Sequence, residues 1–78
     1  MRAGTRFRLS TSTLTVGSTP RGRVAVTIPA GEIVKVAAEP HAEDCMVNVL
    51  YNGRLLSMFV VDLESRGEEL PEASGAHS

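Results

Sequence analysis

The 78-residue sequence has one cysteine, no tryptophan, one tyrosine and two phenylalanines. A single cysteine, Cys45, excludes an intrachain disulfide and is typical of a protein kept in a reducing compartment. The two histidines, His41 and His77, lie far apart, and neither has a second cysteine nearby, so no zinc-binding spacing is present. We therefore expect a cytoplasmic protein with no cofactor.

Long hydrophobic runs are also absent. The longest is four residues, Met58 to Val61, whereas about 20 are needed to cross a bilayer. The N-terminal segment MRAGTRFRLS is basic, but no apolar stretch follows it, so it does not have the pattern of a secretory signal. We expect an intracellular protein with no membrane partner.

Acidic residues are missing from residues 1–31, which hold five arginines, whereas residues 32–78 have a net charge of −6. This asymmetry has two interpretations. One is a basic patch that binds nucleic acid. The other is that opposite charges meet across strands or between subunits. The candidate basic patch consists of Arg6, Arg8, Arg21 and Arg23.

The composition favours β-structure, with nine valines, two isoleucines and six threonines. Alternating patterns predict five short strands separated by turns, and no helical repeat is present. The predicted strands are residues 5–9, 24–28, 32–38, 45–51 and 54–61. Ser and Thr fill most of residues 10–19, which predicts a long loop with at most a short strand at 14–16.

The strongest turn signal is Asn52-Gly53, because a type I′ hairpin turn needs a positive φ at both central residues. The strand that follows has apolar side chains on both faces, one more face than a closed barrel can bury. We expect its surplus face to contact another subunit or another protein. The predicted interface residues are Leu56, Met58 and Val60.

After this strand, Asp62 is predicted to cap one helical turn that ends at Gly67. Five strands at spacings near ten residues favour a small closed barrel, which also removes exposed sheet edges. The predicted fold is therefore an all-β, five-stranded SH3-like barrel over residues 1–70, with a one-turn helix near its end. Residues 71–78 are predicted to be a disordered tail.

Two segments carry a family resemblance: VAVTIPAGEIVKVAA and CMVNVLYNGRLLSMFVVDLESRG. Their order of strand, Pro-Ala-Gly turn, strand, hairpin and short helix is similar to that of SH3-like barrels. The ending resembles that of short bacterial SH3-like proteins of unknown function. The likeness covers about residues 5–69, and its motifs imply a fold rather than a reaction.

Two more distant resemblances imply functions. Type II dihydrofolate reductase, a tetrameric SH3-like barrel, binds folate and NADPH through a Val-Gln-Ile-Tyr run that aligns with residues 55–58. The glutamine of that run is replaced here by Leu56 and the tyrosine by Met58. Sm-like RNA-binding barrels have a similar pattern of an apolar strand, then Asn-Gly, then a second strand. In this sequence, however, Ser57-Met58 stands where their motif has glycine.

The remaining polar residues do not indicate a catalytic site. His41, Glu43 and Asp44 precede Cys45, but acidic neighbours raise the pKa of a thiol and so weaken it as a nucleophile. Asp62 and Glu64 are explained by helix capping and the helix dipole. We therefore expect a non-enzymatic interaction module that binds another protein or itself. The alternatives are a nucleic-acid-binding barrel and a pore-type reductase.

Overall fold

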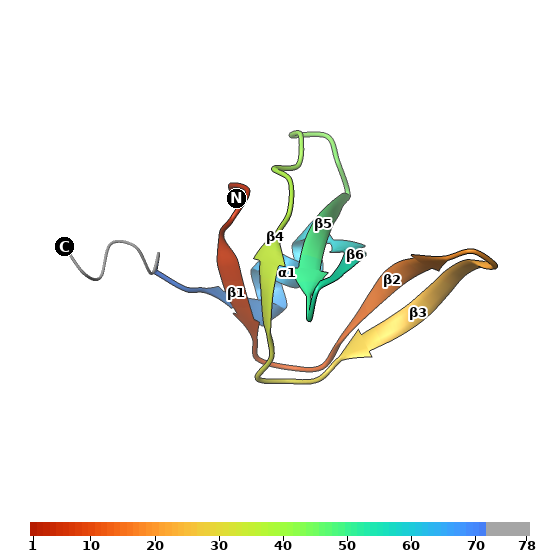
Figure 1. The fold of residues 1–78 in the computed structure, drawn as a ribbon. Helices are drawn as coiled ribbons and strands as arrows, with labels where there is room; N and C mark the ends of the chain where they lie inside the picture. The colour runs from red at the N-terminus through yellow and green to blue at the C-terminus, as the bar shows by residue number, and fades with distance from the viewer. Residues whose placement is uncertain (72–78) are drawn as a thin grey trace.

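The computed structural model describes residues 1–71, which form one antiparallel sheet and a short helix (Figure 1). The strands of this part of the chain are β1 (Arg6–Leu9), β2 (Thr13–Thr19), β3 (Gly22–Ile28), β4 (Ile33–Val36), β5 (Met46–Tyr51), β6 (Arg54–Phe59) and β7 (Gly67–Glu69). The helix α1 spans Val60–Arg66. The prediction of a mostly β protein with one short helix is therefore confirmed. The predicted tail lies outside the described residues, apart from Pro71.

The strand order in the sheet is β3-β2-β6-β5-β4-β1-β7, and every neighbouring pair is antiparallel. β3 and β7 are the two edges. The prediction of a closed five-stranded barrel is wrong, because seven strands form an open sheet and β3 has a neighbour on one side only. No helix within residues 1–71 is long and apolar enough to cross a membrane.

The β2–β3 hairpin explains why the sheet stays open. β2 pairs with β3 along all seven residues, from Thr13 opposite Ile28 to Thr19 opposite Gly22. It pairs with β6 only around Val16 and Gly17. The rest of the hairpin projects from the body of the molecule as an arm (Figure 1), and we use this name for residues 13–28. Because the arm points away from the body, β3 does not reach the strands that would complete a barrel.

The predicted loop over residues 10–19 is wrong, since most of this segment is strand β2. Two of its buried hydroxyl groups do not disrupt the ladder, because they donate hydrogen bonds to backbone carbonyl oxygens. Thr15 Oγ1 donates a 2.7 Å hydrogen bond to the carbonyl oxygen of Val26 on β3. Thr13 Oγ1 donates a 3.0 Å hydrogen bond to the carbonyl oxygen of Thr11. Both threonines are buried, so these bonds satisfy groups that would otherwise be costly to bury.

The core lies on the inner face of the curved sheet, where α1 covers it. Every second residue of the central strands points inward, as the period of a β-strand requires. The core residues are Phe7, Leu9, Ile28, Val34, Val36, Val47, Val49, Leu56, Met58 and Leu63. Leu63 is the buried residue that α1 contributes.

The helix begins differently from the prediction. Its N-cap position is Phe59, whose side chain makes no capping hydrogen bond. Asp62 lies inside the first turn and forms a 3.8 Å ion pair with Arg66, one turn further along the helix. The prediction that Asp62 caps the helix is therefore wrong, whereas the predicted end at Gly67 is confirmed.

Gly67 ends the helix for a reason of packing. Its φ of −105° is accessible to any residue, so positive φ is not the constraint. A Cβ at this position would come within 2.5 Å of the Leu63 carbonyl oxygen and 3.2 Å of the Phe7 ring. Only glycine lets the chain turn from α1 directly into β7 while it packs against β1.

We predict that Gly67→Ala lowers the free energy of unfolding by about 1–3 kcal/mol, the usual cost of overpacking a core. The change should be seen in chemical denaturation followed by circular dichroism. Glu64→Ala, at an exposed position of the same helix, is the control and should stay within about 0.5 kcal/mol of the wild type. Equal stability of the two variants would contradict the packing role of Gly67.

The Asn52-Gly53 turn has the predicted geometry, with φ values of 52° and 76°. Tyr51 and Arg54 flank it as a cross-strand pair. Gly53→Val should destabilise the protein by more than 1 kcal/mol, because a β-branched residue resists positive φ. Asn52→Gly is the matched control and should be nearly neutral. A Gly53→Val variant that melts like the wild type would show that this turn does not fix the hairpin.

Candidate functional site

The outer face of the sheet, opposite the core, carries exposed apolar side chains on neighbouring strands. Leu50 of β5 stands opposite Leu55 of β6, and Met46 stands opposite Phe59. Leu55 is 55% exposed and Phe59 is 53% exposed. Leu14, on the same face of the arm, is 58% exposed. This face and the arm beside it form the candidate functional site.

An open hollow of about 260 Å³ lies on this face where the arm leaves the body. Its lining residues are Val16, Ser18, Arg23, Met46 and Ser57. Ser57 Oγ donates a 2.9 Å hydrogen bond to Asn48 Oδ1 on the neighbouring strand. The lining holds hydroxyl groups and one guanidinium, with neither an imidazole nor a carboxylate to activate them. Such a hollow can bind a polar group between apolar neighbours, but it has no base for a nucleophilic serine.

The predicted interface residues need correction. Leu56 and Met58 are each only 1% exposed and belong to the core. Val60 is partly buried against the core at the start of α1. The predicted outward face of this strand is therefore wrong, and the outward residues are Leu55 and Phe59.

A signal for the correct assignment was present in the sequence. A two-residue Asn-Gly turn fixes the register of its hairpin, so Asn48 must stand opposite Ser57 and Val49 opposite Leu56. Asn48 and Ser57 are the polar pair of this hairpin and mark the face in contact with water. Leu56 then belongs to the core face with Val49.

The four arginines of the predicted basic patch do not lie together. Arg6 and Arg8 are on β1, beside the edge strand β7. Arg21 lies in the turn at the tip of the arm, and Arg23 lies on β3, the opposite edge of the sheet. Four strands separate β1 from β3 in the sheet, and the two groups are at opposite ends of the molecule (Figure 1).

The segment before Cys45 forms a local turn. The backbone N–H of His41 donates a 2.9 Å hydrogen bond to Asp44 Oδ2, and the Asp44 N–H donates a 3.0 Å bond to the His41 carbonyl. Asp44 thus holds the backbone of this turn rather than the imidazole. Cys45 is exposed beside it. In residues 1–71 no three His, Cys, Asp or Glu side chains are close enough to hold a metal ion; His77 lies outside this range.

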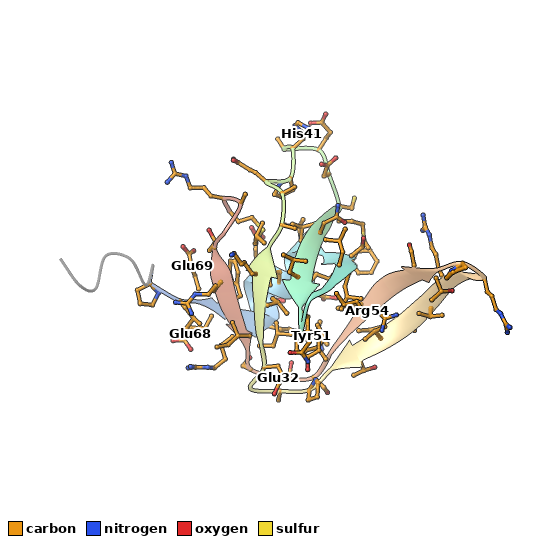
Figure 2. All side chains as sticks on the ribbon, in the orientation of Figure 1. Glu32, His41, Tyr51, Arg54, Glu68 and Glu69 are labelled. Carbon is orange, nitrogen blue, oxygen red and sulfur yellow. The ribbon has the colours of Figure 1, made fainter. Side chains whose placement is uncertain are left out.

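Tyr51 and Glu32 meet at the end of the sheet near the base of the arm (Figure 2). The Tyr51 hydroxyl donates a 3.1 Å hydrogen bond to Glu32 Oε1. Partial burial raises the pKa of the Tyr51 phenol above its ordinary value of 10.0, and the hydrogen bond and charge of Glu32 raise it further. The pair connects the β5–β6 turn to the start of β4.

Comparisons with protein-family models, with curated proteins and with solved structures found no match.

We predict that the pKa of Tyr51 is above 10 in the folded protein and lower in Glu32→Gln. The fold favours the neutral phenol, so this contribution to stability is complete below pH 10 and is lost as the pH rises through the raised pKa. Because the chain has one tyrosine, the ultraviolet absorbance of tyrosinate reports this group alone.

The control is Glu39→Gln, which removes an exposed carboxylate outside this contact and should leave the Tyr51 pKa unchanged. An unchanged pKa in Glu32→Gln would show that the hydrogen bond does not persist in solution.

Proposed function

We propose that this protein is a non-enzymatic interaction module that acts through protein–protein contact of its arm, with a second copy of the chain as the partner. The observation that carries the proposal is the arm itself. β3 is exposed along most of its length, and Ile28 is its one buried residue. An isolated two-stranded hairpin is at best marginally stable in water, so a projecting one is typically supported by a contact.

The apolar side chains of the arm support this interpretation. Val24 is exposed on one face of the arm, and Leu14 is exposed on the other. Leu55 and Phe59 are exposed on the outer face of the body, on either side of the polar Asn48–Ser57 pair. Fully burying such a side chain contributes about 1.5–3 kcal/mol, and roughly half of each is already buried, so each contributes about 1 kcal/mol on contact. Several exposed apolar side chains on one surface favour an interaction site.

The distribution of charge favours a second copy as the partner. The arm carries Arg21 and Arg23 and no acidic residue. Acidic residues lie on the body, including Glu32, which follows the base of the arm. Two copies in opposite orientations bring the basic arm of one towards the acidic body of the other, which favours association at low salt.

The alternative functions receive less support from the geometry. A nucleic-acid-binding patch needs arginines on one face, and the four candidates are divided between the two ends of the sheet. In the alignment with type II dihydrofolate reductase, Leu56 and Met58 hold the positions of two ligand-binding polar residues, and both belong to the core. The resemblance to short bacterial SH3-like proteins stays a prediction.

We predict that the protein self-associates reversibly and that Val24→Asp weakens the association at least tenfold, or by about 1.4 kcal/mol. A charge on the exposed apolar side of the arm must be desolvated when the arm is covered. Analytical ultracentrifugation over a concentration series measures the effect. Circular dichroism should show that the variant stays folded, since Val24 lies outside the core.

Thr11→Asp is the matched control, because it adds the same charge at an exposed position before β2, outside the arm. It should associate like the wild type. A wild-type protein that is monomeric throughout the concentration series would overturn the proposed self-association.

A further inference from the structure

The outer edge of β3 has backbone groups that face away from β2. The Val26 carbonyl oxygen points towards β2, because it accepts the hydrogen bond from Thr15 Oγ1. The Gly22 carbonyl oxygen also points towards β2, because it accepts a 2.9 Å bond from Thr19 Oγ1. Backbone groups of successive residues in a strand alternate in direction. The N–H and C=O groups of Arg23, Ala25 and Thr27 therefore point to the free edge.

This free edge is regular and of limited length. Within the described part of the chain, β3 pairs with β2 alone. Pro20 and Pro29 bound the strand on either side, so its exposed edge is limited to the seven residues Gly22–Ile28. An exposed edge of this kind is a template for pairing with another strand.

We propose that β3 pairs with β3 of a second copy, antiparallel about a two-fold axis at Ala25, so that the two sheets become one. This rests on the proposed self-association and specifies its contact. The register follows from the backbone N–H and C=O groups of Arg23, Ala25 and Thr27, which point to the free edge. Centring the pair on Ala25 brings Arg23 opposite Thr27 of the second copy, so all three residues with free groups lie in hydrogen-bonded pairs. A shift in either direction leaves at least one of them outside the paired segment.

The side chains also fit this register. Val24 stands opposite Val26 of the second copy, which makes two apolar cross-strand pairs on one face. Arg23 stands opposite Thr27, so the two copies of Arg23 are kept apart. The arm tip with Arg21 lies beside the base of the other arm, where Glu32 follows β3 in the sequence. The strand is thus complementary to itself in hydrogen bonding and in apolar contact.

Disulfide cross-linking tests the register directly in a Cys45→Ser background. Ala25→Cys should form a covalent dimer under mild oxidation, because its Cα atoms would lie about 5.5 Å apart across the axis. Disulfides span Cα separations of about 4.4–6.8 Å. Thr27→Cys is the matched control and should not cross-link to itself, since four residues, or about 13 Å, would separate the two thiols along the strands. A mixture of Arg23→Cys and Thr27→Cys chains should give the mixed dimer.

Proline substitution tests the backbone contact without a thiol. The Ala25 N–H faces the free edge, so Ala25→Pro removes an intermolecular hydrogen bond and leaves the β2–β3 ladder intact. It should weaken association at least tenfold while the protein stays folded. Ala25→Val, which keeps the N–H, should associate within a few-fold of the wild type. Circular dichroism of both variants shows whether the fold is retained.

The outcomes separate this contact from the proposed function. Association of the wild type without Ala25→Cys cross-linking would overturn the β3 pairing and leave self-association standing. Self-cross-linking of Thr27→Cys to the same extent as Ala25→Cys would overturn the register. A monomeric wild type that forms no cross-link would overturn both. Cross-linking at Ala25, together with the mixed Arg23–Thr27 dimer, would support the pairing.

Discussion

The Asn52-Gly53 turn is the constraint on which the rest of the structure depends, because it decides which side of β5 and β6 faces the core. A two-residue loop allows one register, and a shift of one residue would turn every side chain of β6 to the opposite face. With Val49 opposite Leu56, the two central strands supply four of the core residues. β4 and β2 then pair on either side of this hairpin, and α1 continues directly from β6. The exposure of Leu55 and Phe59 follows from the same register.

The body and the arm are stabilised in different ways. The body buries apolar residues of β1, β4, β5 and β6 under α1, and it packs tightly enough at Gly67 to exclude a methyl group. The arm contributes Thr13, Thr15 and Ile28 to the buried interior at its base. Beyond Gly17, where β2 no longer pairs with β6, the arm depends on its own ladder, so its outer half has a lower local stability than the body. This division places the proposed interaction surface on the part of the fold that contributes least to the core.

Much of the fold follows from local patterns in the sequence, and the errors have physical causes. Alternation predicts β1 and the strands from β3 to β6, and Asn52-Gly53 predicts the central hairpin. The Ser- and Thr-rich segment predicts a loop, because hydroxyl groups bonded to their own backbone compete with the ladder. In the structure Thr15 bonds to the neighbouring strand instead. A barrel is favoured because closure removes exposed sheet edges. Closure, however, depends on where the arm points, and no local pattern specifies this direction. The exposure of Leu55 and the burial of Leu56 follow from the register of the turn, because this register pairs Asn48 with Ser57 on the outer face.

The pairing of β1 with β7 has a consequence for the order in which the chain folds. Phe7 stands opposite Glu69, and Leu9 stands opposite Gly67, so two strands about sixty positions apart in sequence are neighbours in the sheet. Closing a loop of that length must precede the gain from the contact, whereas the β2–β3 and β5–β6 hairpins need only short loops. During synthesis, β1 cannot complete its place in the sheet until β7 has left the ribosome. The hairpins are therefore available to form early, β1 can join the sheet through its pairing with β4, and β7 is incorporated last.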